Sequence, residues 1–406
     1  MTITLRAVTA EEYPDFHAAL SLSFGGPEHE DQRELEATIT EYDRTIAAYD
    51  GTRVVGTAGA FGLTMSVPGA DARVAGVTVV TVAPTHRRQG LLTRMMTEQL
   101  ADVRRRGEAL AALWASEGAI YGRFGYGLAS TTGPVSLPTA RSAFIRAPWW
   151  PGRVRLVEPA DARDVIAPAY EIARGQRPGR IKRSPAWWNK RLADLPHWRG
   201  DGSPLRVAVY EDGGACTGYA LYRTHATWGD VGPDGKVDVR EVLGVTSDAT
   251  AALWRYLCDI DLMRTLVVPH EPPDTALLHL LADPRAARLG LGDNLWVRVV
   301  DVGPALEQRR YATADRLVLE VSDETCPWNA GRFLLEGAPD GATCRPTDAG
   351  PDLSFSAREL GAVYLGGTRM SALAAAGRVV EHTAGAVARA DLLFGWSPLP
   401  ACPEIF

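Results

Sequence analysis

The feature that most constrains the fold is a change of pattern within residues 77–96, which read VTVVTVAPTHRRQGLLTRMM. Residues 74–82 are apolar and mostly β-branched, which is typical of a strand buried on both faces. From Gly90 to Gly107 the apolar residues recur every three or four positions, which predicts a helix of about four turns. A buried strand that leads into an amphipathic helix predicts an α/β domain.

The junction itself indicates a binding site for an anion. The first backbone N–H groups of a helix are unpaired and lie at the positive end of its dipole. Arg87 and Arg88 add side-chain charge, and Gly90 has no Cβ to obstruct a diphosphate that approaches the main chain. Val80 and Val82 end the preceding strand, where a pantetheine amide chain could add as a further strand. The structural alternative is that the arginines cap a surface helix and the glycine serves a tight turn.

The chain is long enough for two or three domains, because its 406 residues exceed the usual size of one hydrophobic core. The first region alternates predicted strands and helices up to about residue 135. Strands are expected at residues 2–8, 53–67 and 108–116, and helices at residues 11–24 and 34–42.

Two further regions follow. A proline-bounded linker at residues 142–154 opens the second, in which residues 205–225 predict two strands around a Gly-Gly turn. Residues 237–257 repeat the order of strand and helix without arginines or a glycine at the junction. The third region predicts a strand at residues 316–323 and an alanine-rich helix at 371–379. It ends in PLPACPEIF, whose apolar character predicts an anchored terminus.

Composition and motifs exclude several classes of function. A net charge of -6 gives no basic excess for nucleic acid, and the basic run at residues 174–188 predicts a surface loop leading into a packed helix. Neither a membrane span nor a signal peptide is recognisable, so we expect a cytoplasmic protein, with export by a non-classical route left open. The five cysteines are widely spaced without a C-x-x-C pair, so we expect thiols rather than disulfides, and no metal.

A second motif, YGRFGYG at residues 121–127, follows the next predicted strand. Together with the R-x-x-G that ends at Gly90, it resembles the Gcn5-related N-acetyltransferase (GNAT) family. In that family R/Q-x-x-G-x-G/A binds the pyrophosphate of acetyl-CoA, and the tyrosine of Y-x-x-x-G-F/Y lies by the thioester sulfur. Leu92 departs from the pattern, because it stands at the third small position.

The stretches VAPTHRRQGLLTRM, ASEGAIYGRFGYG and LGAVYLGG and the terminal phenylalanine resemble one branch of that family, the enhanced intracellular survival (Eis) acetyltransferases of actinobacteria. The branch shares the leucine at position 92. The resemblance implies an α/β (α+β) fold of tandem GNAT-like domains, with mixed sheets flanked by helices, and a sterol-carrier-protein-like domain after them. We expect an active GNAT domain at 1–140, a degenerate one at 141–295 and the third domain at 296–406. The resemblance also implies a homohexamer, with no nucleic acid or membrane as partner.

Position by position, the resemblance implies acetyl-CoA as cosubstrate and a set of residues that contact it: Val80, Thr81, Val82, Arg88, Gln89, Gly90, Leu91, Leu92, Thr93, Ser116 and Glu117. It implies Tyr121 as the general acid and the terminal carboxylate of Phe406 as the general base. Tyr126 is a nearby competitor, but it occupies the aromatic slot of the G-F/Y pair. His86 is expected to cap or pack in the turn.

For the acceptor, the resemblance implies multi-site acetylation of aminoglycosides or similar polyamines, and thus antibiotic resistance. Phe24, Glu28 and Glu404 are the candidate substrate-binding residues. The acidic run at residues 28–36 could equally be a solvated helix face. Gly26 stands where Eis proteins can carry an acid, and the penultimate Ile405 is apolar, which could narrow the substrate range. Two alternatives stay open, acetylation of a protein or peptide lysine and a non-catalytic protein that binds an apolar ligand.

Overall fold

The computed structural model describes residues 3–146 and 149–406. The chain forms two compact units. The first unit comprises Met1–Ser130, Pro178–Lys182 and Asp293–Phe406, and the second comprises Thr131–Arg177 and Arg183–Gly292. Each unit is therefore built from stretches that are distant in the sequence. Thr2 of the predicted first strand and residues 147–148 of the predicted linker lie outside the described residues.

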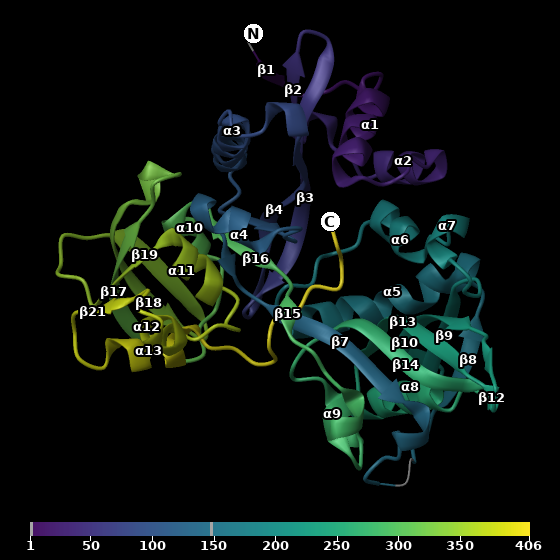
Figure 1. Cartoon of the computed structure of the whole chain (residues 1–406). Helices are drawn as coiled ribbons and strands as arrows, with labels where there is room; N and C mark the ends of the chain where they lie inside the picture. The colour runs from purple at the N-terminus through teal and green to yellow at the C-terminus, as the bar shows by residue number, and fades with distance from the viewer. Residues whose placement is uncertain (1–2, 147–148) are drawn as a thin grey trace. The chain divides into compact units, whose positions relative to one another are not determined.

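The first unit contains a seven-stranded mixed sheet in the order β1-β2-β3-β4-β5-β16-β6 (Figure 1). β1 to β4 are antiparallel, β5 is parallel to β4, and β16 pairs antiparallel with β5 and β6. The strands are β1 (Thr4–Arg6), β2 (Thr45–Asp50), β3 (Arg53–Val67), β4 (Ala70–Val82), β5 (Leu110–Leu113), β16 (Trp296–Val299) and β6 (Gly127–Leu128). The strand predicted at 53–67 is confirmed at both ends.

Helices flank this sheet, and α3 supplies much of the core. They are α1 (Tyr13–Phe24), α2 (Glu30–Ala37), α3 (Leu91–Arg105) and α4 (Gly118–Tyr121), with short 3-10 turns at Tyr42–Arg44, Pro84–His86 and Gly122–Phe124. Met95, Met96 and Leu100 of α3 are fully buried. The helix predicted from Gly90 is thus confirmed, and its apolar face packs as the periodicity predicted.

The helix predicted at residues 34–42 is wrong in its bounds, because α2 spans Glu30–Ala37 and a separate 3-10 turn covers Tyr42–Arg44. The hydroxyls of Thr38 and Thr40 donate to the carbonyls of Leu35 and Glu36. These local bonds satisfy carbonyls at the end of the helix and offer the backbone an alternative to continuing it.

The third region of the chain adds a five-stranded sheet to the first unit, in the order β19-β18-β17-β20-β21. Its strands are β17 (Asp315–Ser322), β18 (Gly331–Ala338), β19 (Gly341–Pro346), β20 (Leu353–Ser356) and β21 (Val380–Glu381), and its helices are α10 (Val302–Glu307), α11 (Ala357–Val363), α12 (Met370–Ala375) and α13 (Ala386–Phe394), with a 3-10 turn at Pro327–Asn329. The predicted helix 371–379 ends early, because Gly377 adopts a φ of 72° and its N–H bonds back to Ala374.

The second unit contains another seven-stranded sheet, in the order β15-β7-β14-β13-β10-β9-β8. Its elements are β7 (Thr131–Pro138), β8 (Arg153–Val157), β9 (Arg206–Asp212), β10 (Ala215–His225), β13 (Gly235–Gly244), β14 (Met263–Glu271), β15 (Gly292–Asp293), α5 (Pro159–Gln176), α6 (Pro185–Leu192), α7 (Pro196–Arg199), α8 (Ser247–Cys258) and α9 (Ala276–Leu280), with 3-10 turns at Thr139–Arg141 and Pro284–Ala287 and a small hairpin of β11 (Trp228–Gly229) and β12 (Gly232–Pro233). The predicted turn between two strands and the predicted strand followed by a helix are both present. Of the helices that the structure describes, none is long and apolar enough to cross a membrane.

Two strands lie in a different sheet from their neighbours in the sequence. β7 ends at Pro138, before the boundary predicted at residue 140, yet it pairs with β14 of the second unit. β16 begins at Trp296, where the third domain was predicted to start, yet it lies between β5 and β6 of the first sheet. The predicted ranges 1–140, 141–295 and 296–406 therefore do not coincide with the sheets.

Candidate functional site

A bulge in β4 shapes the candidate site. The register between β3 and β4 shifts between Thr57 and Gly59, so that Val79 and Val80 oppose the single residue Ala58. Val79 adopts a φ of 50°, which is strained for a β-branched residue. The Thr57 hydroxyl donates to the Val79 carbonyl at 2.6 Å and thereby holds the bulge.

Beyond the bulge, β4 separates from its parallel neighbour. β4 pairs with β5 only from Val74 to Gly76, while the strand continues to Val82. Residues 78–82 are half-buried, unlike the fully buried run that precedes them. The end of β4 consequently offers main-chain groups to a cavity, as the splayed strand expected from the sequence would.

The helix that follows begins without a side-chain cap. Gly90 is the N-cap residue of α3 with a φ of 74°, and a Cβ placed there would meet nothing within 4 Å. Arg88 also adopts a left-handed conformation, with a φ of 63°, and its exposed side chain has no partner among the described residues. The positive end of α3 and an unpaired guanidinium therefore adjoin an open approach to the backbone.

These elements line one cavity of about 500 Å³. It is lined by Ser23, Phe24, Val80, Thr81, Val82, His86, Arg87, Arg88, Gly90, Leu91, Leu92, Thr93, Ser116, Glu117, Ile120, Tyr121 and Arg123. Of the residues expected to contact acetyl-CoA, Gln89 is the one outside this lining, and its side chain is exposed. Phe24 lines the cavity, whereas Glu28, Glu404 and Phe406 do not.

Two tyrosines lie together near the cavity, and Tyr121 alone lines it. Their ring centroids are 6.0 Å apart, in an edge-to-face arrangement. Burial, assisted by the charge of Glu117, raises the pKa of Tyr121 above its usual value of about 10. Burial raises the pKa of Tyr126 further, because that side chain is wholly enclosed. Tyr121 is therefore a neutral phenol at physiological pH at the wall of the cavity.

The glycines of YGRFGYG are explained by close packing. Gly125 has a φ of 81°, and a Cβ there would clash with the guanidinium of Arg298, which forms a buried ion pair with Asp323 at 2.5 Å. A Cβ on Gly127 would clash with the backbone of α11 at Ala362. The loop that carries Tyr121 is thus held by β16 and by a helix of the third region.

The C-terminal tail is anchored, as its apolar sequence predicted. Phe406 is 8% exposed, and its ring lies against Gly76 of β4, with Cδ2 3.3 Å from the position of a Cβ on that glycine. The N–H of Ala401 donates to the carbonyl of Pro178 at 3.0 Å. Glu404 is buried, whereas Ile405 is 57% exposed.

Comparisons with known proteins agree with this geometry. Residues 4–129 and 179–299 match two acetyltransferase (GNAT) domain families, and residues 302–403 match the sterol carrier protein domain. The chain is 44% identical to an uncharacterised N-acetyltransferase of Streptomyces coelicolor, over all of both chains. It is 36% identical to the N-acetyltransferase Eis of Mycobacterium tuberculosis, over 97% of each chain. The crystal structure of Eis1 from Mycobacterium abscessus matches with a TM-score of 0.87 and 32% identity, over 99% of this chain and 100% of that one.

The chain belongs to the Eis family of GNAT N-acetyltransferases. It has two GNAT domains followed by a sterol-carrier-protein-like domain, as expected from the sequence. Membership makes it an acetyltransferase that uses an acetyl-CoA-type cosubstrate.

Within this Eis-family chain, the acidic run is engaged in local ion pairs. Arg33 binds Glu28 at 3.0 Å and Glu30 at 3.2 Å, and the buried His17 lies 3.3 Å from Glu36. No residue of α2 is buried. These acids therefore lie on a solvated helix face, which is the alternative that the sequence left open. His86, expected to cap or pack, lies in the turn with its Nε2 3.4 Å from Asp50, and it also lines the cavity.

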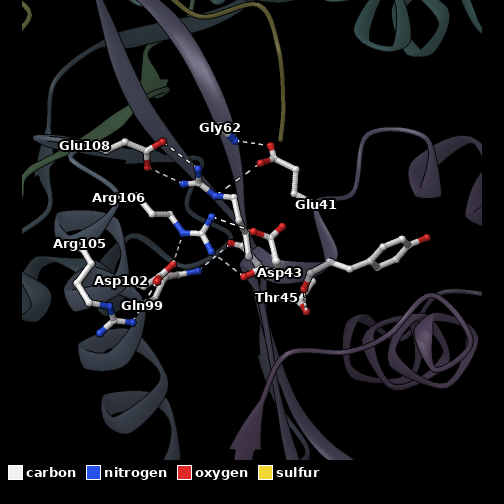
Figure 2. A network of polar contacts seen from close by, with 12 residues as sticks. Glu41, Asp43, Thr45, Gly62, Gln99, Asp102, Arg105, Arg106 and Glu108 are labelled. Carbon is white, nitrogen blue, oxygen red and sulfur yellow. Dashed lines mark hydrogen bonds and ion pairs between the residues drawn. The ribbon is translucent and has the colours of Figure 1, made fainter.

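Sequence reasoning missed a polar network at the C-terminal end of α3 (Figure 2). Arg44 donates two hydrogen bonds to the buried Glu108, at 2.8 and 2.6 Å. Glu41 accepts from the N–H of Gly62 at 2.6 Å, and Arg106 donates to Asp43 at 2.9 Å. This network fastens the turn before β2 to β3 and to the end of α3. Its partners are far apart in the chain, and no local pattern could have paired them.

Proposed function

We propose that this enzyme transfers acetyl groups from acetyl-CoA to amines of aminoglycosides or similar polyamines, with the chemistry in the cavity at the β4–α3 junction. One observation carries the proposal. An uncapped helix terminus with an unpaired arginine and a buried, protonated tyrosine line the same cavity. An anion site and a proton donor in the lining of one cavity are what a coenzyme thioester requires.

The binding step uses charge and backbone. In the proposal, the N–H groups of residues 90–93 and the Arg88 guanidinium bind the pyrophosphate. Hydrogen bonds to a charged group contribute about 1.5–3 kcal/mol each. The open approach at Gly90 supports this, because nothing of the protein occupies the space where a Cβ would be. The pantetheine arm then lies along residues 80–82, which the bulge separates from β5.

The transfer step needs an oxyanion donor and a proton for the departing thiolate. The acceptor nitrogen attacks the thioester carbon, and main-chain N–H groups of the bulged β4 stabilise the tetrahedral oxyanion. The C–S bond then breaks, and Tyr121 gives its proton to the sulfur. Because burial raises the pKa of Tyr121, the phenol keeps its proton and stays neutral until the thiolate forms.

The acceptor must also lose a proton, and we assign this task to the terminal carboxylate of Phe406. An α-carboxyl has an ordinary pKa of about 3.5, which desolvation raises and so makes it a stronger base. The burial of Phe406 and its anchoring on β4 support this role. Phe24 and the carboxylates of Glu28 and Glu404 are proposed to contact the cationic acceptor.

Release of thiol from acetyl-CoA tests the proposal over a panel of aminoglycosides, linear polyamines and lysine peptides. We expect turnover with the first two, and strong loss on Tyr121→Phe and on removal of Phe406. Turnover with peptides alone would instead identify a lysine acetyltransferase. No turnover with any amine would favour the non-catalytic protein that binds an apolar ligand.

The proposal includes a homohexamer in the cytoplasm. Membership of the Eis family supports the assembly, and light scattering after size-exclusion chromatography measures it. None of the cysteines in the described residues forms a disulfide, which supports a reducing compartment. Cell fractionation tests the location.

A further inference from the structure

A buried asparagine holds the C-terminal tail by its backbone. Asn294 is 0% exposed. Its Nδ2 donates to the carbonyl of Cys402 at 3.0 Å, and its Oδ1 accepts from the N–H of the same residue at 2.9 Å. The side-chain amide thus pairs with Cys402 as a neighbouring strand would. This reciprocal pair fixes both the position and the direction of the chain four residues before Phe406.

The orientation of this amide is itself determined. The Ser130 hydroxyl donates to Oδ1 of Asn294 at 2.8 Å and accepts from the N–H of Leu295 at 3.0 Å. The N–H of Asn294 donates to the carbonyl of Ser130 at 3.1 Å. Oδ1 therefore receives two donors, and exchanging the oxygen and the nitrogen would set donor against donor. Asn294 and Ser130 form a fixed clamp, which we call the tail clamp.

The tail clamp is one of several anchors of the tail. Ala401 approaches Gly179 so closely that a Cβ on this glycine would lie 3.1 Å from the Ala401 carbonyl oxygen, and its N–H donates to the carbonyl of Pro178. The last anchor is Phe406, which packs on Gly76. Between the tail clamp and Phe406, Glu404 is buried and Ile405 is exposed. Since this segment is short, the tail clamp limits the positions that the terminal carboxylate can reach.

We propose that Asn294 is a positioning residue for acetyl transfer, which acts through the backbone of Cys402 to hold the Phe406 carboxylate where the acceptor amine loses its proton. The inference rests on the proposed function of that carboxylate as general base. A base that moves by about 1 Å from its productive position can cost about a hundredfold in rate. The tail clamp makes no contribution to the cavity lining, so acetyl-CoA binding should not depend on it.

The test is steady-state kinetics of Asn294→Leu, which has a similar shape and cannot form either hydrogen bond with Cys402. We expect kcat to fall about 10- to 100-fold and KM for acetyl-CoA to stay within about threefold. The limb of the pH profile that reports the base should shift or flatten. Carboxypeptidase should release Phe406 faster from the variant than from the parent, which measures the tail directly.

Asn329→Leu is the matched control. Asn329 is also buried in the first unit, and its side chain donates to the carbonyls of Val299 and Val300 and accepts from the N–H of Val302. It holds a loop rather than the tail. Because Asn329 also donates to Asp323, whose partner Arg298 packs against the loop of Tyr121, its loss should cost stability and can lower kcat, but it should leave the release of Phe406 and the limb of the pH profile that reports the base unchanged. Equal effects of Asn294→Leu and Asn329→Leu on these readouts would overturn the inference.

Combining Asn294→Leu with removal of Phe406 separates this inference from the proposed function. If the tail clamp acts through the carboxylate, the double variant should be about as slow as the truncated chain alone. Full activity of the truncated chain would overturn the base and the inference together. A slow truncated chain beside a fully active Asn294→Leu would overturn the inference alone. Ser130→Ala, which removes the support of the amide, should give a smaller effect in the same direction and serves if Asn294→Leu does not fold.

Discussion

The β4–α3 junction of the first unit and the β13–α8 junction of the second unit both begin with a bulged strand. In β4 the bulge leaves residues 80–82 half-buried beside the cavity. In β13 the register shifts so that Arg240 is the extra residue. There the protein's own side chains fill the space, since Arg240 donates to the carbonyl of Ala193, and Glu241 binds Arg183 at 2.8 Å and Arg191 at 2.9 Å.

The two helices also begin differently. The hydroxyl of Thr246 caps α8 by accepting from the N–H of Ala249 at 3.1 Å, and a Cβ on Gly244 would clash with Thr250. At α3 the N-cap is Gly90, without a side-chain bond. One strand-and-helix layout therefore borders an open cavity in the first unit and is filled by the protein's own side chains in the second. The difference lies in the cap and in the residues behind the bulge rather than in the topology.

The largest expected effect tests whether the chemistry belongs to the first junction alone. Tyr121→Phe should lower kcat about a hundredfold or more, because the thiolate loses its proton donor. Since burial raises the pKa of this phenol above about 10, the parent enzyme should lose no activity from its titration between pH 7 and pH 9. Stopped-time assays across that range measure both effects. An unchanged kcat in the variant would remove Tyr121 from the mechanism.

The next effect concerns the filled bulge of the second unit. Glu241→Gln leaves the buried Arg183 and the partly buried Arg191 without their carboxylate and should lower the free energy of unfolding by about 3–5 kcal/mol. Burial alone would raise the pKa of Glu241, but the charges and hydrogen bonds of Arg183 and Arg191 outweigh it and lower this pKa below its usual value of about 4.3. Its contribution is therefore complete above pH 4.3 and lost as the pH falls through the lowered pKa. Denaturant unfolding at pH 7 and pH 3 checks this, and a variant as stable as the parent would contradict it.

A smaller effect is expected from a comparison of Arg88, just before α3, with Arg255 in α8. Arg88→Gln should raise KM for acetyl-CoA about 10- to 100-fold, because a charged hydrogen bond to the pyrophosphate is lost. Its melting temperature should not change, since the Arg88 side chain has no partner in the described part of the chain. Arg255→Gln in α8 is the control, because it breaks an ion pair with Asp259 and should leave KM unchanged. Equal KM values for the two variants would argue against an anion site at α3.

The smallest effect compares the two caps. Thr246→Ala should cost about 1 kcal/mol of stability through the lost cap and should leave KM unchanged. Gly90→Ala should cost about 1–2 kcal/mol, because alanine is strained at a φ of 74°, and should also raise KM for acetyl-CoA. Thermal unfolding and coenzyme titration of the two variants separate stability from binding. A rise in KM for Thr246→Ala would show that the second junction also serves the coenzyme.

Local patterns predicted the parts of the site that lie within one strand and the helix after it. Most residues from Val80 to Thr93 line one cavity with Tyr121, because a strand, its turn and the next helix are adjacent in the chain and in space. The bulge at Val79 carries no such signal, since a valine at positive φ contradicts its own preference. The support of that residue comes from Thr57 on the neighbouring strand.

Contacts between distant segments could not be predicted either. Arg44 and Glu108 are 64 residues apart, and Asn294 and Cys402 are 108 apart. Each pair is joined by the fold rather than by any spacing in the sequence. The sheets that contain β7 and β16 could not be predicted for the same reason. In the sequence each strand looks like a member of the region around it, yet β7 joins the sheet of the second unit and β16 joins the first sheet.

The position of β16 has a consequence for how the enzyme is made. On the ribosome, the chain up to residue 128 can form β1 to β5, but the strand that joins β5 to β6 emerges only after the second unit has been translated. Until then the edge of β5 carries unpaired backbone groups and is open to other strands. A fragment that stops at residue 140 would keep the R-x-x-G and YGRFGYG motifs yet lack an interior strand of the first sheet, so this region should require the whole chain to become stable.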